Sequence, residues 1–387
     1  MIRGIAMAAA AAALAFGMGP TGAKAEPGVT PDAVAFAQVA ALEGPAGALG
    51  TGMRAGILAA FEEANRAGGV HGRKVTLDSF DDGYEPDRAV SEVKSLIDGG
   101  AHFGLIGAVG TPTSKAAQPA ATAAGVPFIG PFTGAGFLRD PGLKNVWNLR
   151  ATYAAETEAW IKHLVDEKGM KTIAILYQDD GFGRVGLAGV TAALEKRGMT
   201  LAAEGTYTRN TTAVKSALLD IRKAKPEAVV MVGAYKPIAA FVKLARQLKM
   251  DPTFVNISFV GSRALSDELG PDGAGVIISQ VVPFPWNDAL PVVAAYQAAM
   301  KAVDAGAQPN FVTLEGYLVG RMALAALEAA GPEPTRAAYL AAFEGLGALD
   351  FGGVTASFGP GDNQGLDDVF LTRMDGAGGF EQVGSGS

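Results

Sequence analysis

Hydroxyl side chains gather at residues 111–114, Thr-Pro-Thr-Ser, where a predicted helix follows an apolar run. Thr111 is a good N-cap residue, and Pro112 suits the first helical position. Free backbone N–H groups and the hydroxyls of Thr113 and Ser114 would then face the same space. This arrangement favours a site for a carboxylate or another electron-rich group. Plain helix capping by Thr111 is the alternative interpretation of the same pattern.

Three more predicted strands end in loops that carry candidate ligand contacts. Thr133 lies in the Gly/Pro turn 129–135, for which an ordinary turn is the alternative interpretation. Tyr235 follows an apolar run and offers a flat apolar face with one hydroxyl, a common form of ligand contact. Ser258 has the same placement after the run 253–257. Open α/β sheets bind ligands at the carboxyl ends of their strands, so these loops are candidates for one site.

Acidic residues at strand ends have a simpler interpretation. Asp179 and Asp180 are adjacent and would suggest a metal site or an acid–base pair. Neighbouring residues seldom point into one site and no histidine lies near, so helix capping is the favoured role. Phe182, two residues further on, is a candidate lid aromatic.

No pattern of an enzyme stands out in the chain. The three histidines share no ligand spacing, and no nucleophile elbow or phosphate-binding loop occurs. The absence of cysteine excludes disulfides, thiolate metal sites and a cysteine nucleophile. The acidic run 81–87 lacks the alternating ligands of a calcium loop. We therefore expect no catalysis, no metal and no cofactor.

Composition indicates an α/β protein with two cores. The 387 residues are 49% hydrophobic and only 18% charged, and a single core stops growing at roughly 250–300 residues. The formal net charge is −7. A mildly acidic chain without a basic patch argues against a nucleic-acid partner.

The first 25 residues have the features of a secretory signal peptide. Arg3 precedes the apolar run 5–18, and Ala23-Lys24-Ala25 follows as a cleavage site. The apolar run has about 14 residues, fewer than the ~20 that span a bilayer. We expect cleavage after Ala25 and no membrane insertion. Since no cysteine is present for lipid attachment, we expect that no lipid anchor tethers the mature protein to a membrane.

Apolar runs alternate with helical patterns along the mature chain, which predicts parallel sheets with helices on both faces. Two segments look like crossings between lobes, 145–152 and 281–288, the latter with two prolines. The predicted strands are 34–42, 75–80, 103–109, 126–129, 172–177, 228–232, 253–257, 276–280, 352–358 and 368–374. The predicted helices are 51–66, 86–98, 113–124, 154–168, 183–197, 211–224, 237–248, 289–306 and 313–330.

The order and spacing of several short motifs resemble the leucine/isoleucine/valine-binding family of type I periplasmic binding proteins of ABC transporters. These motifs are Gly44-Pro45, Gly-Gly-Val-His-Gly-Arg-Lys at 68–74, Asp81-Asp82 with Pro86, Thr113-Ser114 with Gln118-Pro119, and Gly183. The similarity covers residues 34–374, nearly the whole mature chain. It implies two doubly wound Rossmann-like lobes with parallel sheets, joined by three hinge crossings, with ligand in the cleft between them.

The resemblance also implies the boundaries of the lobes. We expect residues 26–148 and 284–351 in the first lobe, and 149–283 and 352–380 in the second. Residues 381–387 are expected to form a flexible tail.

The same resemblance implies roles for individual residues. In the family, a Ser/Thr helix start and a later strand-end loop meet the ligand carboxylate, aromatic residues cover it, and an acidic residue meets its ammonium group. The matching positions are Thr113, Ser114 and Thr133 for the carboxylate, Phe182 and Tyr235 for the aromatics, Ser258 for the acidic residue, and Leu49 for a side-chain pocket.

Two of these positions depart from the family pattern. Ser258 cannot neutralise a buried ammonium group, which would be costly to hold unpaired. Phe182 stands where the amino-acid binders often have tyrosine. Glu43 stands where relatives tend to carry Ser or Thr, so it either supplies a replacement charge or is exposed.

The resemblance implies a monomeric periplasmic solute-binding subunit of an ABC importer, whose partner is a permease in the inner membrane. Its ligand is expected to be small, polar or carboxylate-bearing, and amino acid-like. The alternatives are a binder of amides or aromatic acids, and a ligand sensor for a membrane receptor. A hydrolase that uses Asp179, Asp180 or Glu43 is disfavoured, because no nucleophile–base pair is visible.

Overall fold

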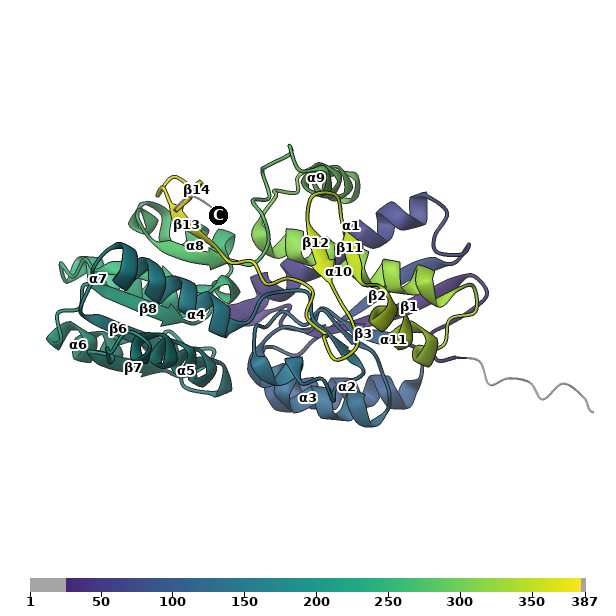
Figure 1. Ribbon diagram of the computed structural model, residues 1–387, viewed down its shortest axis with the longest axis horizontal. Coiled ribbons are helices and arrows are strands. Elements are labelled where there is room, and N and C mark those ends of the chain that lie inside the picture. Colours follow the sequence, from purple (N-terminus) through teal and green to yellow (C-terminus); the bar gives the residue numbers. More distant parts are fainter. Residues whose placement is uncertain (1–25, 384–387) are drawn as a thin grey trace, which may run out of the picture.

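Two α/β lobes lie side by side along the longest axis of the molecule (Figure 1). The computed structural model describes residues 26–383, so the predicted signal peptide and most of the predicted tail lie outside the described residues. Each lobe is built on its own sheet. The predicted fold class, two Rossmann-like lobes, is confirmed. None of the helices in the described residues is long and apolar enough to cross a membrane.

The first lobe has a five-stranded parallel sheet in the order β2-β1-β3-β4-β5. Its strands are β1 (Ala33–Ala40), β2 (Lys74–Asp81), β3 (Gly104–Ile106), β4 (Phe128–Ile129) and β5 (Val146–Trp147). Its helices are α1 (Gly47–Arg66), α2 (Pro86–Gly99), α3 (Thr111–Ala123), α9 (Pro291–Val303), α10 (Phe311–Ala330) and α11 (Arg336–Gly345).

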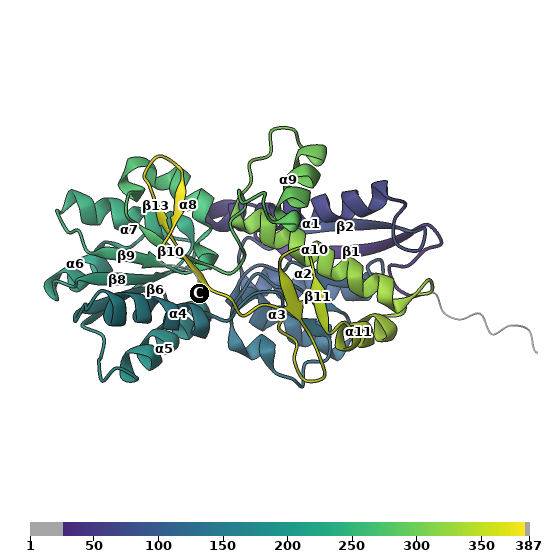
Figure 2. The same cartoon turned by 45° about the horizontal axis from the view of Figure 1, so that its top comes forward.

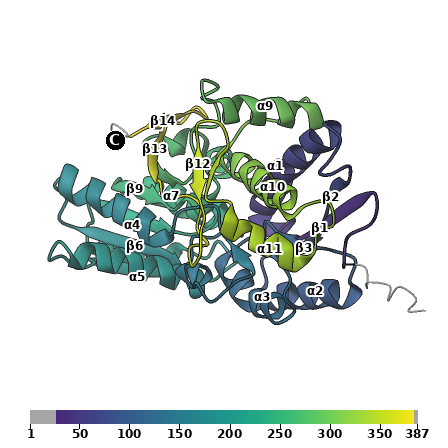
Figure 3. The same cartoon turned by 45° about the vertical axis from the view of Figure 1, so that its right-hand side comes forward.

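Successive side chains of β1 point to opposite faces of this sheet, and helices cover both faces. Phe36 packs with Phe61 of α1 and Tyr339 of α11 on one face. Ala37 and Val39 belong to a separate core formed with α2 and α3 on the other face. Successive residues of a strand point to opposite faces, so one apolar strand supplies both cores. Figure 3 shows α1, α9 and α10 packed together.

The second lobe has a seven-stranded sheet in the order β14-β13-β10-β9-β8-β6-β7. Its strands are β6 (Ile173–Gln178), β7 (Ala203–Tyr207), β8 (Ala228–Val232), β9 (Thr253–Asn256), β10 (Ile277–Gln280), β13 (Phe370–Met374) and β14 (Phe380–Gln382). Its helices are α4 (Tyr153–Ile161), α5 (Gly181–Glu195), α6 (Lys215–Lys223), α7 (Tyr235–Gln247) and α8 (Ser262–Leu269). Figure 2 shows α7 and α8 on one side of the sheet and α4 and α5 on the other.

The second sheet departs from the parallel pattern at one edge. β13 pairs antiparallel with β10, and β14 pairs antiparallel with β13. The chain reaches this edge from the first lobe and turns back after Met374, so no crossover helix separates the last two strands. A two-residue hairpin can join antiparallel strands, whereas parallel strands need a longer crossover.

Three segments cross between the lobes, after β5, after β10 and after the pair β11 (Ala348–Asp350) and β12 (Thr355–Ser357). The first and third crossings lie against each other, because Leu366 N–H donates to the carbonyl oxygen of Leu149 over 2.7 Å. Phe358, just after β12, contacts Trp147 of the first lobe. We therefore propose that the third crossing lies between Leu366 and β13. The boundary that the resemblance implies lies earlier, at residue 352.

A close contact between α1 and α10 yields the first prediction. A Cβ atom at Gly56 would lie 2.0 Å from the carbonyl oxygen of Thr313, so no side chain fits without displacing backbone. Gly56→Ala should therefore destabilise the protein by roughly 1–3 kcal/mol and lower its Tm by several degrees in thermal unfolding. Gly99→Ala is the matched control, since a Cβ there meets nothing within 4 Å among the described residues. Equal Tm values for the two variants would contradict this packing.

Candidate functional site

Thr111 and Thr133, from two strand-end loops of the first lobe, are joined by a hydrogen bond of 2.7 Å between their hydroxyls. Both side chains are buried. The prediction that Thr111 caps α3 was wrong, because Gly110 is the N-cap residue, with φ 101° and ψ 151°. Glycine adopts this conformation readily, and a Cβ at Gly110 would lie 2.3 Å from Tyr84. The hydroxyl of Thr111 is therefore available to Thr133.

Thr113 and Ser114 line a small cavity inside the first lobe, which they share with Asp82. Thr113 Oγ1 donates to the carbonyl oxygen of Gly110 over 3.1 Å. Ser114 Oγ and Asp82 Oδ2 are buried and have no hydrogen-bond partner within residues 26–383. Burial raises the pKa of Asp82 to about 7, although the backbone N–H of Tyr84 acts in the opposite direction. The helix start thus places two hydroxyls beside a buried acid.

Four aromatic rings meet where the lobes touch, and we call this contact the interlobe seam. Phe259 of the second lobe lies 5.4 Å from Phe132 and 5.9 Å from Tyr84 of the first, between ring centroids. Phe182, at the start of α5, lies 4.7 Å from Phe259. All four rings are buried. Phe182 therefore lies beside Phe259, which was not among the predicted site residues, and its role as a lid stays a prediction.

Tyr235 and Leu49 also lie where the two lobes touch. The backbone N–H of Ala48 donates to the hydroxyl of Tyr235, the first residue of α7, over 3.4 Å. Leu49 is buried, and a Cβ at Gly261 of the second lobe would lie 2.5 Å from its Cδ2 atom. Glu43 is exposed. A contact between its carboxylate and a ligand stays a prediction.

Ser258 is already held by a carboxylate of its own lobe. Its backbone N–H donates to Glu156 Oε2 over 2.8 Å, and its hydroxyl donates to Glu156 Oε1 over 2.9 Å. Ser279 donates to the same carboxylate. The Ser258 hydroxyl also accepts a hydrogen bond from Arg150. Position 258 has no acidic side chain of its own, but the carboxylate of Glu156, on α4, is hydrogen-bonded directly to it.

Arg150, in the first crossing, connects this group to the first lobe. Its Nε lies 3.2 Å from Glu315 Oε1 of α10, and its Cζ lies 4.5 Å from the ring centroid of Phe132. Arg150 and Glu315 are both buried. Burial lowers the pKa of Arg150, but the Glu315 and Glu156 carboxylates outweigh it and the net direction is upward. Burial raises the pKa of Glu315 to about 7.

Polar side chains also join the lobes nearer the surface. Arg209 donates to Glu85 Oε2 over 2.7 Å, and Asn210 donates to Glu85 Oε1 over 2.7 Å. We call these three residues the rim clasp. The amide of Gln178 donates to the Tyr84 hydroxyl over 3.3 Å. The clasp connects the turn before α2 in the first lobe with the loop after β7 in the second.

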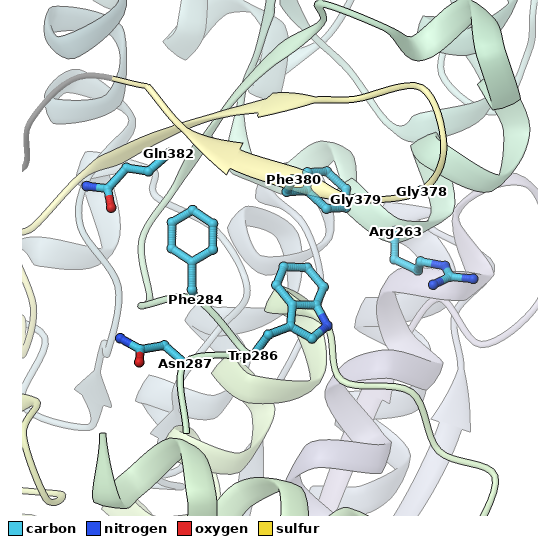
Figure 4. A pocket seen from close by; sticks show the side chains of 8 residues that line it. All are labelled: Arg263, Phe284, Trp286, Asn287, Gly378, Gly379, Phe380 and Gln382. Atoms are coloured by element: carbon cyan, nitrogen blue, oxygen red, sulfur yellow. The ribbon is translucent and has the colours of Figure 1, made fainter. Parts of the chain in front are cut away.

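A pocket of about 620 Å³ lies at the second crossing, away from the predicted site residues. Figure 4 shows Phe284 and Trp286 of the crossing facing Phe380 of β14, with Arg263 at one end. Trp286 stacks on Phe380 with centroids 5.7 Å apart. Both Trp286 and Phe380 also contact Phe311, so the aromatic residues at this crossing connect the start of α10 with the edge of the second sheet.

Sequence reasoning missed Arg150, Glu156 and Glu315, although two of them carried a signal. Arg150 is the one charged residue in the predicted crossing 145–152. Glu315 is the one charged residue in the first half of the apolar helix α10. Isolated charges in apolar segments are expensive to bury alone, which indicates partners elsewhere in the fold.

The chain is similar to known binding proteins along most of its length. Residues 33–379 match the sequence profile of a family described as periplasmic binding protein. The Leu/Ile/Val-binding protein BraC3 of Rhizobium johnstonii is 29% identical over 301 residues, covering 76% of this chain and 78% of that protein.

Solved structures agree with this similarity. A possible leucine/isoleucine/valine-binding protein from Rhodopirellula baltica SH 1 superposes with a TM-score of 0.87 at 37% identity, covering 92% of this chain and 97% of that chain. A substrate-binding periplasmic protein from Ralstonia solanacearum gives a TM-score of 0.85 at 26% identity, over 90% and 100% of the two chains.

Asp82, the buried acid that follows β2 and shares a cavity with the start of α3, leads to a prediction about pH. The folded protein holds the Asp82 proton more tightly than the unfolded chain, where aspartate titrates near ~3.9. Its stabilising contribution is complete below about pH 4 and is lost as the pH rises through about 7. Asp82→Asn removes the carboxylate that is costly to ionise when buried, and its amide oxygen can still accept the hydrogen bond from the Tyr84 backbone. The variant should therefore be more stable than the wild type by roughly 1–4 kcal/mol at pH 8, and its stability should differ little at pH 4. Thermal unfolding at both pH values measures the difference.

Asp81 provides a control, because its pKa is shifted in the direction opposite to that of Asp82. Burial raises the pKa of Asp81, but the N–H groups of Leu42, Gly83 and Glu43 and the Arg88 side chain outweigh it, so the pKa falls. Asp81 therefore contributes stability above its unfolded-state pKa, and this contribution is lost as the pH falls through its folded value. Asp81→Asn should destabilise the protein at pH 8. Loss of stability in Asp82→Asn at pH 8 would contradict the assignment.

Proposed function

The chain belongs to the leucine/isoleucine/valine-binding family of type I periplasmic binding proteins, and from this premise we propose that it delivers a small ligand to an ABC importer. Proteins of this family are solute-binding proteins, not enzymes. The proposed ligand site is the interlobe seam. The observation that carries this proposal is that polar groups and aromatic rings of both lobes meet there, at a hinge of three crossings.

The proposed mechanism is closure about the hinge. With the lobes apart, a ligand would dock on the first lobe beside Thr111 and Thr133, whose hydroxyls share one hydrogen bond and keep further bonding capacity. Phe182, Phe259 and Tyr235 would then arrive with the second lobe. A ligand favours the closed form only to the extent that it makes additional contacts there.

We propose an amino acid-like or other carboxylate-bearing ligand. The name of the Rhizobium relative and the description of the Rhodopirellula structure support a branched-chain ligand class for those proteins. The aromatic seam supplies apolar surface for a ligand body, and the threonine pair supplies hydroxyls for a polar head.

The proposed setting is the periplasm, after cleavage near Ala25, with a monomeric protein presenting its closed form to an inner-membrane permease. The membership of the chain in a periplasmic family supports this setting. A pull-down of the closed, ligand-bound protein with membrane extracts would identify the permease partner, or a receptor in its place.

Thermal unfolding in the presence of amino acids, amides and aromatic acids tests the proposal. A ligand present at about 100 times its Kd stabilises the folded state by ~2.7 kcal/mol, which should raise the Tm by several degrees. The proposal fails if no compound in these three classes raises the Tm.

The rim clasp yields a prediction about closure. Glu85→Gln removes the ion pair with Arg209 and should weaken ligand affinity by roughly 1.5- to 5-fold, because the pair is partly exposed and forms between the lobes. The loss should be larger at low salt. Titration calorimetry at two salt concentrations measures it.

Glu333→Gln is the matched control for this variant, since it removes an exposed ion pair with Arg73 inside the first lobe. The Glu333→Gln variant should bind the ligand with the same affinity as the wild type. If Glu85→Gln also binds like the wild type at low salt, the clasp takes no part in closure.

A further inference from the structure

Arg150 carries two buried donor atoms that make no hydrogen bond within residues 26–383. Nε lies 3.2 Å from Glu315 Oε1, and Nη2 donates to the Ser258 hydroxyl. Nε and Nη1 are both buried, and neither makes a hydrogen bond in the described part of the chain, so the contact of Nε with Glu315 is an ion pair alone. A buried unpaired donor is costly, and more so when it is charged. An acceptor on a bound molecule would remove this cost.

The position of Arg150 places the Nη1 donor between the lobes. Its carbonyl oxygen, in the first crossing, accepts a hydrogen bond of 3.0 Å from Arg139. Its guanidinium contacts Phe132 and Glu315 of the first lobe and Ser258 of the second. The unpaired nitrogen therefore lies in the interlobe seam, where the hinge and both lobes come together.

We propose that Nη1 of Arg150 binds the carboxylate of the ligand, and that the ligand is a small carboxylic acid with an apolar body and no ammonium group. The inference rests on the proposed function and names the class of solute. Guanidinium is the cation best matched to a carboxylate, and the hydrogen bond between them is charge-assisted. The rings of Tyr84, Phe132, Phe182 and Phe259 provide the apolar surroundings for the rest of the molecule.

The carboxylates of the seam are already engaged, which argues against an ammonium group. Glu156 accepts hydrogen bonds from the Ser258 backbone, the Ser258 hydroxyl and the Ser279 hydroxyl. Glu315 is paired with Arg150. A ligand ammonium would have to displace one of these partners or remain buried without a counter-charge.

Binding of a charged ligand beside Arg150 should change the protonation of Glu315. Arg150, Glu156 and Arg139 are the charged groups that act on Glu315, whose pKa burial raises to about 7. A second carboxylate beside Arg150 would raise the pKa of Glu315 further, so the complex should take up a proton. Affinity for an acid should therefore fall as the pH rises above 7. A ligand ammonium would lower this pKa and release a proton.

Matched ligands test the proposed class in calorimetry and thermal unfolding. Leucine differs from 4-methylpentanoate only by its ammonium group, and 4-methylpentanamide lacks the negative charge. Phenylalanine, 3-phenylpropanoate and 3-phenylpropanamide form the aromatic set. In at least one set the acid should bind roughly 10-fold or more tightly than its two partners, with proton uptake when measured in buffers of different ionisation enthalpy.

The outcomes separate this inference from the proposed function. If in neither set the acid binds more tightly than both the amino acid and the amide, the inference is overturned and the proposed function is left intact. Proton release on binding overturns it as well. If none of the six compounds binds, the inference falls, and the wider Tm screen decides the proposed function separately.

Two variants test the role of Arg150 without leaving the Glu315 carboxylate buried and unpaired. Glu315→Gln keeps the guanidinium, so it should bind the acid and lose the pH dependence near 7. The double variant Arg150→Gln, Glu315→Gln removes both charges and should weaken acid binding by roughly 10- to 100-fold relative to Glu315→Gln. Circular dichroism and the unliganded Tm establish that both are folded. Equal acid affinity in the two variants would overturn the role of Arg150.

Discussion

A buried guanidinium needs acceptors around it, and this constraint organises the contact between the two lobes. Burial of an isolated charge is costly, so Arg150 depends on the groups that surround it. It obtains a carboxylate from α10 in the first lobe and a hydroxyl from the second lobe. Glu315 would be unfavourable on an apolar helix without Arg150. Ser258 is in turn fixed by Glu156.

The first crossing, the interlobe seam and the rim clasp together hold the two lobes against each other. The crossing that contains Arg150 pairs with the third crossing through backbone hydrogen bonds. Away from Arg150, the contacts between the lobes include the four rings of the seam, the rings of Phe311 and Phe380, and polar contacts such as that of Glu85 with Arg209. Under the proposed function, a ligand that adds contacts between the lobes would shift the balance toward the closed state.

Most of the fold could be predicted from the sequence because its strands are apolar runs buried on both faces. β8 (Ala228–Val232) was predicted with its observed bounds. β5 and β7 were missed for different physical reasons. β5 has two residues, and β7, an edge strand, alternates buried and exposed positions around a glycine. Propensity and periodicity carry little information for such short or edge strands.

The site could be predicted only in part. The strand-end loops were found because the carboxyl ends of parallel strands converge, as the bond between Thr111 and Thr133 illustrates. Partners across the seam could not be found in this way. Arg150 and Ser258 are separated by 108 residues, the first in a crossing between the lobes and the second within the second lobe. No local pattern determines how two lobes meet, so contacts of this kind require the structure.

A crystal structure of the protein with the tightest-binding solute tests the central claim most directly. The account predicts solute density between Phe132 and Phe259, with an acceptor atom about 3 Å from Arg150 Nη1. Density confined to the pocket beside Trp286, with the seam unchanged, would contradict it.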